Sequence, residues 1–406
     1  MKRILFLCQF FYPENNSSAT LPFDTATCLA ANGFSVDVLC GMPKEYNNNA
    51  NVPQTETIKG INICRLDYIQ LSRGTKAGRL INYFSFTFSV LCHVHAFKKY
   101  DDIVVYSNPP ILPIVPVIAH RLFGTKVVFV AYDVYPEVAY ASGTLRQGDL
   151  IDNVMQHING LIYKRASMIV ALTDEMRDFL LAHRPQLTED RVITIENWAH
   201  EEHEERVEFP TEACSYFGCQ PDQFVVAYIG NMGICQDMET LLNAMKELAD
   251  DNKVHFLFAG HGSKKERVES LIRDDHIKNA QVAGFLTGNT LQEALSVSSC
   301  CVVSLEKGLK GMCAPSKYYS YLHAGKPVVA IVEEGSYLWK EIHSENIGCA
   351  VRIGDVEGLK TILVDLADTP ERAKQMGRNA RLLYERKYAK DVGLLKYVQM
   401  MQKMQK

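Results

Sequence analysis

The chain has 406 residues, which is enough for two domains of ordinary size, each with its own hydrophobic core. Its 43 Lys and Arg and 47 Asp and Glu give a formal net charge of −4 and are mixed along the sequence, which argues against a nucleic-acid binder with a basic face. The 12 cysteines are scattered and several lie in apolar runs, a pattern typical of buried thiols in a reducing cytosol. Only Cys214 and Cys219 are spaced like metal ligands, and no second pair lies near them, so we expect no metal site.

The elements of the chain follow an alternating pattern. The first apolar run, residues 4–7, is too short for a signal peptide, so we expect a cytoplasmic protein. Short apolar runs then alternate with stretches of helical period, which indicates βαβ units and parallel sheets. The predicted strands are residues 4–8, 36–39, 103–106, 127–131 and 168–172 in the first half, and 225–229, 254–259, 301–305 and 328–332 in the second.

These elements predict an α/β protein of two Rossmann-like domains, residues 1–200 and 206–387, with a C-terminal helix at about 388–406 that packs back on the first domain. The polar run 200–205 has no core pattern and is the predicted linker. Helix 238–249 illustrates the helical period, because one face collects its apolar residues: Met238, Leu241, Leu242, Met245 and Leu248. Such domains bind ligands in the cleft at the carboxyl ends of their strands.

Residues 80–97 are apolar and rich in aromatic side chains, and basic residues flank them: Arg73, Lys76 and Arg79 before, Lys98 and Lys99 after. Polar residues within the run argue against a membrane-spanning helix: Asn82, Ser85, Thr87, His93 and His95. An interfacial helix drawn to the anionic inner face of the plasma membrane fits the pattern better. The alternative is a core helix of the first domain.

Polar side chains follow the strands of the first half. Asp133 comes directly after strand 127–131, so we expect its carboxylate at the edge of the cleft rather than in either core. A helix cap is the alternative, since Asp after a strand often begins a helix. Asn16 and Ser17 follow the first strand at a helix start, where they could hydrogen-bond a sugar or phosphate or act as plain caps.

Glycines follow the strands of the second half. Gly230 and Gly233 flank a turn after strand 225–229, where the missing side chains let backbone amides approach a phosphate. A tight turn without a ligand is the alternative. Glycines also close later strand ends, which is common in turns: Gly260, Gly262 and Gly284.

The most informative segment, residues 311–330, has the pattern of a loop, a helix, a tight turn and a buried strand. Pro315 suits the first turn of the helix, Ser316 can cap free amides, and Gly325 with Pro327 ends the helix. A helix start carries unpaired N–H groups and a partial positive charge, so a cation at Lys317 is unfavourable unless an anion such as a diphosphate lies beside it. The alternative is that Lys317 points into water or meets a carboxylate.

This segment resembles the donor-binding motif of retaining glycosyltransferases of the GT-B type, family-four-like, and is similar to the bacterial surface-polysaccharide branch that includes the L-fucosamine transferases. The motif is Pro-Ser-Lys, two residues, Glu-Tyr-Leu, then Ala-Gly-Lys-Pro-Val, and the chain matches it except at Ser320. Weaker motifs extend the resemblance over nearly the whole chain: Tyr12-Pro13-Glu14, Ser107-Asn108-Pro109-Pro110, Asp133-Val134-Tyr135-Pro136-Glu137, Asn197-Trp198, Gly230-Asn231-Met232-Gly233, Gly260-His261-Gly262 and Gly284-Phe285.

The resemblance implies a GT-B fold and a retaining transfer of a hexosyl or N-acetylaminosugar group from a nucleotide diphosphate sugar, UDP favoured over GDP, to a lipid-linked or saccharide acceptor. It implies a role in capsule, O-antigen or exopolysaccharide biosynthesis, without a cofactor or a metal. The implied catalytic residues are Asp133, Glu137 and Lys317, and the implied acceptor-side residues are Asn16, Ser17, Asn108 and Asp133. The implied donor-binding residues are Gly230, Asn231, Gly233, Gly260, Gly262, Gly284, Phe285, Pro315, Ser316, Lys317 and Ser320.

The chain departs from the family pattern at charged positions. Met312 and Ser320 stand where the family has its two glutamates, and Asn231 and Gln236 stand where relatives often have an arginine and a lysine. Glu333 and Glu341 repeat the glutamate spacing but follow the strand, on the wrong side of the helix. Two other readings stay open: a non-catalytic GT-B partner in a polysaccharide assembly complex, and a sugar-nucleotide epimerase of the same fold.

Overall fold

The computed structural model describes residues 2–43, 52–71, 75–199 and 211–405. The chain forms two units, the first from Met1–His200, Gly311–Ala314 and Lys390–Lys406, the second from Glu201–Lys310 and Pro315–Ala389. The expected division used continuous ranges, and the segment Gly311–Ala314 departs from it because its backbone pairs within the first unit, where the Val134 amide donates to the Met312 carbonyl at 2.8 Å. The linker expected at 200–205 and the basic residue Arg73 lie outside the described residues.

The described part of the first unit holds an eight-stranded sheet in the order β3-β4-β2-β1-β5-β6-β7-β8, parallel except where β3 meets β4. The strands are β1 Arg3–Cys8, β2 Ser35–Gly41, β3 Thr55–Ile58, β4 Ile61–Leu66, β5 Asp102–Tyr106, β6 Lys126–Ala131, β7 Met168–Ala171 and β8 Val192–Thr194. The helices are α1 Ser17–Ala31, α2 Lys76–Leu91, η1 Val94–Lys99, α3 Ile114–Phe123, α4 Glu137–Ala141, α5 Leu150–Arg165, α6 Asp174–His183, η2 Glu189–Arg191 and α15 Lys390–Lys403.

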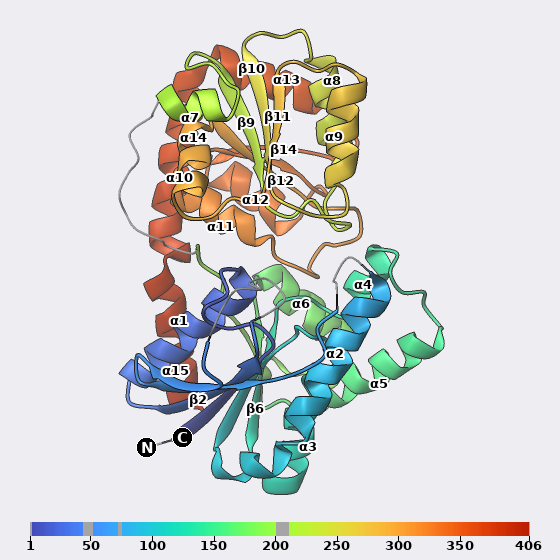
Figure 1. Ribbon diagram of the computed structural model, residues 1–406, viewed down its shortest axis with the longest axis vertical. Coiled ribbons are helices and arrows are strands. Elements are labelled where there is room, and N and C mark those ends of the chain that lie inside the picture. The colour runs from blue at the N-terminus through green and yellow to red at the C-terminus, as the bar shows by residue number, and fades with distance from the viewer. Residues whose placement is uncertain (1, 44–51, 72–74, 200–210, 406) are drawn as a thin grey trace. The chain divides into compact units, whose positions relative to one another are not determined.

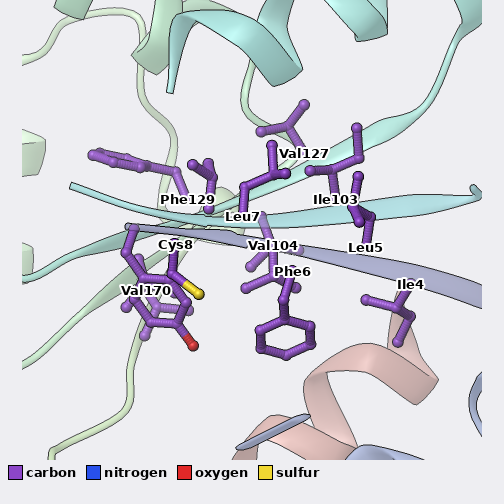
Figure 2. Packing of buried hydrophobic residues seen from close by; sticks show 14 of the residues in the cluster. Ile4, Leu5, Phe6, Leu7, Cys8, Ile103, Val104, Val127, Phe129 and Val170 are labelled. Carbon is purple, nitrogen blue, oxygen red and sulfur yellow. The ribbon is translucent and has the colours of Figure 1, made fainter. Parts of the chain in front are cut away.

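Helices cover both faces of this sheet, with α1 and α15 on one side and α2, α3 and α5 on the other (Figure 1). Successive side chains of a strand point to opposite faces, so both faces can bury apolar residues. Figure 2 shows this along β1, where Leu5 and Leu7 point to one face while Ile4 and Phe6 point to the other. These four side chains are at most 2% exposed, which explains why β1 is a continuous apolar run.

The described part of the second unit holds a six-stranded parallel sheet in the order β11-β10-β9-β12-β13-β14. Its strands are β9 Phe224–Ile229, β10 Val254–Ala259, β11 Ala280–Ala283, β12 Cys300–Ser304, β13 Val328–Ile331 and β14 Gly348–Val351. Its helices are α7 Thr211–Tyr216, α8 Glu239–Glu247, α9 Lys265–Asp274, α10 Gly288–Val297, α11 Ser316–His323, α12 Tyr337–Ser344, α13 Val356–Asp368, α14 Pro370–Leu383 and η3 Tyr384–Tyr388. The two parallel sheets confirm the predicted α/β class.

Every predicted strand is confirmed, with ends that differ by at most two residues, and helix 238–249 is confirmed as α8. The strands β3, β4, β8, β11 and β14 were not predicted. They are short or lack a run of apolar residues, as β4 does because Arg65 lies in it. The Arg65 side chain is fully buried, pairs with Glu56 and donates to the carbonyl oxygens of Pro53 and Tyr12, each at 2.9 Å. A buried ion pair is what allows this charged residue inside the sheet.

The helix α2 forms most of the apolar segment 80–97 and has one face in the core, as the core-helix alternative expects. One face, which includes Phe86 and Val90, is buried in the core of the first unit. The buried Asn82 side chain bonds the backbone of Leu71 through both its amide oxygen and its amide nitrogen. The opposite face is apolar and exposed: Leu80, Ile81, Phe84 and Phe88 are between 40% and 67% exposed. Within the described residues, no helix combines the length and apolar character needed to cross a membrane.

The C-terminal helix α15 belongs to the first unit and lies beside α1 (Figure 1). Its buried face adds Leu394, Tyr397 and Met401 to the core. Lys390 donates to the Asp24 carboxylate at 2.6 Å, and the Trp198 indole donates to the same carboxylate at 3.0 Å. Asp24 lies on α1, so this carboxylate joins α15 and the Trp198 of the Asn-Trp motif to α1.

We expect Leu394→Ala to destabilise the first unit by about 2–5 kcal/mol. The Leu394 side chain is only 7% exposed, so its removal leaves a cavity in the core. Leu395→Ala is the matched control on the next residue, which is 56% exposed, and should change stability by less than about 0.5 kcal/mol. Urea unfolding followed by tryptophan fluorescence compares the two. Equal losses of stability would contradict the packing of α15.

Candidate active-site residues

Glycines bring the loops after β9 and β10 into contact in the second unit. The Met232 amide donates to the His261 carbonyl at 2.7 Å, and the Gly230 amide donates to the Ala259 carbonyl at 2.8 Å. A Cβ at Gly260 would lie 2.0 Å from the Gly230 carbonyl oxygen, and both glycines have a positive φ. Only glycine fits such a backbone approach. These glycines are therefore required for the shape of the loop edge.

The other glycines of the predicted donor site differ in their surroundings. A Cβ at Gly262 would lie 2.4 Å from the Met232 carbonyl oxygen, and one at Gly233 would lie 2.7 Å from the Asn231 side-chain nitrogen. At Gly284, in contrast, a Cβ would meet no atom within 4 Å. Its neighbour Phe285 is 58% exposed and packs edge-on against the His261 ring.

Lys317 lies in the first turn of α11, at the same edge of the sheet. Its ammonium donates to the Tyr228 hydroxyl and, at 3.3 Å, to the Asn231 carbonyl, and lies 3.7 Å from the centre of the Tyr228 ring. No carboxylate among the described residues pairs with it. Burial without a counter-charge lowers the pKa of Lys317 to about 7. An anion that arrived beside this ammonium would therefore meet a cation that no carboxylate pairs with.

Three other predicted residues lie in or next to α11 in the sequence: Ser316, Ser320 and Met312. Pro315, not Ser316, is the N-cap of α11, and Ser316 is the exposed first helical residue, so the expectation that Ser316 caps the helix is wrong. Ser320 is half-buried one turn after Ser316. Met312 belongs to the first unit.

Glu333 and Glu341, which repeat the spacing of the family glutamates, form hydrogen bonds within the second unit. Glu333 accepts from the Gly308 amide at 2.9 Å. Glu341, on α12, accepts from the Tyr318 hydroxyl at 2.6 Å and from the Tyr388 hydroxyl at 2.7 Å. Both carboxylates therefore have structural roles, as expected from their place after the strand.

Asp133 lies directly after β6 in the first unit. The Ser107 hydroxyl accepts from its amide at 3.2 Å, and its backbone forms a bridge with Cys313. Its carboxylate has no hydrogen-bond partner among the described residues, and Pro136 rather than Asp133 is the N-cap of α4. Burial raises the pKa of Asp133 to about 6. A carboxyl with a pKa near neutral can both accept and return a proton.

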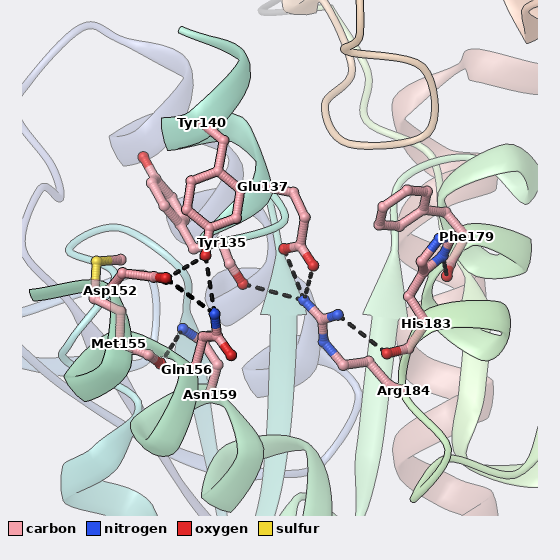
Figure 3. Close-up of polar contacts among 10 residues, drawn as sticks. All are labelled: Tyr135, Glu137, Tyr140, Asp152, Met155, Gln156, Asn159, Phe179, His183 and Arg184. Carbon is pink, nitrogen blue, oxygen red and sulfur yellow. Dashed lines mark hydrogen bonds and ion pairs between the residues drawn. The ribbon is translucent and has the colours of Figure 1, made fainter. Parts of the chain in front are cut away.

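Glu137 begins α4 and is held by an ion pair (Figure 3). The Arg184 guanidinium donates to its carboxylate at 2.7 Å and also to the Tyr135 carbonyl at 3.3 Å. Both side chains are mostly buried, at 12% exposed for Arg184 and 20% for Glu137. This geometry fixes the turn between Asp133 and α4 and leaves Glu137 less available as a base.

The remaining acceptor-side residues follow neighbouring strands. Asn16 is the N-cap of α1, through its backbone and not its side chain, and Ser17 is exposed. Asn108 follows β5 and is half-buried. Since β1, β5 and β6 are neighbours in the sheet, their carboxyl ends bring Asn108 and Asp133 to one edge.

Three residues of the second unit were missed by sequence reasoning. Tyr228 lies in an apolar strand, so the sequence pattern predicts an ordinary core residue there. Lys264 and Glu306, which follow β10 and β12, form an ion pair with an N–O distance of 2.5 Å. No charge motif in the sequence connects residues so far apart. Among the described residues, no group of three or more potential ligands could hold a metal ion.

Comparison with known proteins defines the class. A model described as glycosyl transferase 4-like domain matches residues 23–198, and one described as glycosyl transferases group 1 matches residues 223–369. Among solved structures, sucrose-phosphate synthase from Thermosynechococcus elongatus has a TM-score of 0.77 at 16% identity, over 100% of this chain and 99% of that one. Anabaena Alr3699/HepE in complex with UDP-glucose has a TM-score of 0.70 at 14% identity, over 99% and 100%. The chain is a GT-B glycosyltransferase.

Two relatives narrow the class. The probable glycosyltransferase WbjE of Pseudomonas aeruginosa is 24% identical over 316 residues, 77% of each chain. The putative colanic acid biosynthesis glycosyl transferase WcaI of Escherichia coli strain K12 is 27% identical over 109 residues, which cover 27% of this chain and 26% of that protein. The chain is thus related to glycosyltransferases of bacterial polysaccharide biosynthesis.

Proposed function

We propose that the protein transfers a hexosyl or N-acetylaminosugar group, with retention, from a nucleotide diphosphate sugar to a lipid-linked or saccharide acceptor in the synthesis of a bacterial surface polysaccharide. The observation that carries the proposal is the Lys317 ammonium, which lies at a helix start without a carboxylate partner. A leaving diphosphate needs such charge stabilisation. UDP is the favoured nucleotide because HepE, of the same fold, is described in complex with UDP-glucose.

In the donor site, the start of α11 supplies backbone amides and Lys317 supplies the charge. The loop from Gly230 to Gly233 forms the wall of the site, because its Gly230 and Met232 amides already donate to the Ala259 and His261 carbonyls. Gly260, Gly262, Gly284 and Phe285 border the nucleoside, and Ser320 lies where a glutamate would hold the ribose hydroxyls. The hydroxyl of serine is shorter and uncharged, so we assign ribose binding to Ser320 together with backbone groups.

On the acceptor side, Asp133 is the proposed catalytic carboxylate. It orients the acceptor hydroxyl and takes its proton as the sugar is transferred. Glu137, fixed by Arg184, supports this turn as a positioning residue. Asn16, Ser17 and Asn108 are the proposed contacts of the acceptor.

The exposed apolar face of α2 supports a peripheral site on the inner face of the plasma membrane, where a lipid-linked acceptor would be found. Phe84 and Phe88 are 60% and 67% exposed on this face, and the basic residues Arg79 and Lys98 flank it. An amphipathic helix of this kind binds the interface through apolar burial and attraction to anionic lipid.

A second candidate function is a non-catalytic GT-B partner in a polysaccharide assembly complex. The absence of both family glutamates, at Met312 and Ser320, favours it. A thermal-shift panel of UDP, GDP and their sugars, followed by a donor-hydrolysis assay, separates the two. A response to one nucleotide with slow hydrolysis supports the enzyme, and no response to any of them supports the partner.

Lys317→Ala should weaken binding of the responding nucleotide diphosphate by about 1–3 kcal/mol, the cost of losing a charge-assisted contact to phosphate. Wild-type affinity should also fall between pH 7 and pH 9. The reason is that a pKa of about 7 leaves Lys317 increasingly neutral over this range, while the phosphate stays fully charged. Isothermal titration measures both effects.

Lys317→Arg is the matched control, because arginine stays charged at every pH used. It should keep most of the affinity and lose the pH dependence. Affinity that is unchanged in Lys317→Ala would contradict the role of this lysine.

Asp133→Asn should leave nucleotide binding near the wild-type value and lower transfer by about 10²-fold or more, because only the proton-accepting group is removed. A single-turnover transfer assay, run beside titration with the nucleotide, measures the two separately. Transfer at the wild-type rate would show that Asp133 has a structural role only.

Acidic phospholipid vesicles should retain the protein more than neutral vesicles in sedimentation, and the difference should shrink in high salt. The Phe84→Ser/Phe88→Ser variant should lose most of this retention. Leu382→Ser, at a position on α14 that is 62% exposed, is the control and should behave as wild type. Equal sedimentation of wild type with both vesicle types would remove the membrane proposal.

A further inference from the structure

The loop between β9 and α8 has no lysine or arginine, yet two ammonium groups from other elements contact it. Lys317, from α11, donates to the carbonyl of Asn231 at 3.3 Å. Lys264, after β10, donates to the carbonyl of Gln236 at 2.6 Å. Asn231 and Gln236 are the two positions where relatives often have an arginine and a lysine. The loop has no cationic residue of its own, but Lys317 and Lys264 place two ammonium groups against it.

Lys264 occupies an electrostatically unusual position. It is the N-cap of α9, where the helix already carries a partial positive charge, so a cation there needs an anion nearby. Its amide donates to the Met232 carbonyl at 2.8 Å, which fixes its backbone against the loop. The Glu306 carboxylate, at 2.5 Å from its ammonium, is the anion that the structure supplies.

Glu306 is itself fastened to the loop. It follows β12, and its amide donates to the Cys235 carbonyl at 2.9 Å. Because β9 lies between β10 and β12, the ion pair joins the two neighbouring strand ends across the loop of the central strand. Neither side chain is deeply buried, with 22% of Lys264 and 33% of Glu306 exposed, so a ligand in the site can reach them.

We propose that Lys264 is a second cation of the donor diphosphate site, and that Glu306 holds it in place until the diphosphate takes over as its partner. The inference rests on the proposed function and deepens it. Lys317 and Lys264 would contact the diphosphate from two sides of the same glycine-rich loop, and this would restore the paired positive charge that the loop itself lacks. Phosphate binds two ammonium groups more tightly than one.

The test compares neighbouring lysines by isothermal titration with UDP and with uridine at fixed ionic strength. Lys264→Met should weaken UDP binding about tenfold or more and leave uridine binding unchanged, since uridine has no phosphate. Lys265→Met is the matched control, because Lys265 pairs with Glu269 on α9 and should bind UDP as wild type does. Lys264→Arg keeps the charge and should recover most of the affinity, which covers the case of a poorly folded Lys264→Met.

The Glu306→Gln variant distinguishes a role of Lys264 in UDP binding from a purely structural role of the Lys264–Glu306 ion pair. If Glu306 competes with the diphosphate for Lys264, this variant should bind UDP as tightly as wild type or about threefold more tightly. If the pair only fastens the loop, Lys264→Met and Glu306→Gln should weaken UDP and uridine binding alike and lower the melting temperature equally.

Three outcomes overturn the inference. Equal UDP affinity in Lys264→Met and Lys265→Met overturns the inference and leaves the proposed function standing. An equal loss of UDP affinity in Lys264→Met and Glu306→Gln does the same. If wild-type protein binds no nucleotide diphosphate, the proposed function fails and the inference fails with it.

Discussion

The second unit depends on the close approach of the loops that follow β9 and β10. A Cβ at Gly260 would lie only 2.0 Å from the Gly230 carbonyl oxygen, so the approach requires glycine. The approach places backbone groups, the Lys264 ion pair and the start of α11 at one edge of the sheet. A partly buried lysine without a carboxylate partner, Lys317, completes that edge. A lysine held without a carboxylate costs stability, and an anion bound beside it would offset that cost.

The first unit is organised around a different requirement, a carboxylate kept free of partners. Asp133 is fixed through its backbone, by Ser107 and by the bridge to Cys313, while its side chain accepts no hydrogen bond from the described residues. The adjacent carboxylate of Glu137 is neutralised by Arg184. Two acidic residues four positions apart therefore have different surroundings. One is held in an ion pair, and the other has a pKa that burial raises to about 6.

Much of the fold follows from the sequence, because buried parallel strands are continuous apolar runs and helices have their own period. The strands that sequence reasoning missed are short or lack an apolar run, as β4 does because the ion-paired Arg65 lies in it. The position of Lys317 at a helix start was also readable, since proline and the helix pattern define that start.

The rest of the site could not be read from the sequence. The pairing of Lys264 with Glu306 joins residues from two different strand ends, and Tyr228 looks like any other core residue of an apolar strand. Such contacts depend on strand order and on loop geometry, which local patterns do not encode. At α11 the sequence pattern predicts Ser316 as a cap, whereas Pro315 holds the N-cap position.

The central claim is that a nucleotide diphosphate binds at the carboxyl edge of the second sheet. Amide hydrogen exchange with and without UDP tests it directly, because it reports protection segment by segment. The account predicts slower exchange in residues 230–236, 260–264 and 316–320, and little change at the distant edge around β14. Protection at β14 without protection of those three segments, or no change at saturating UDP, would contradict it.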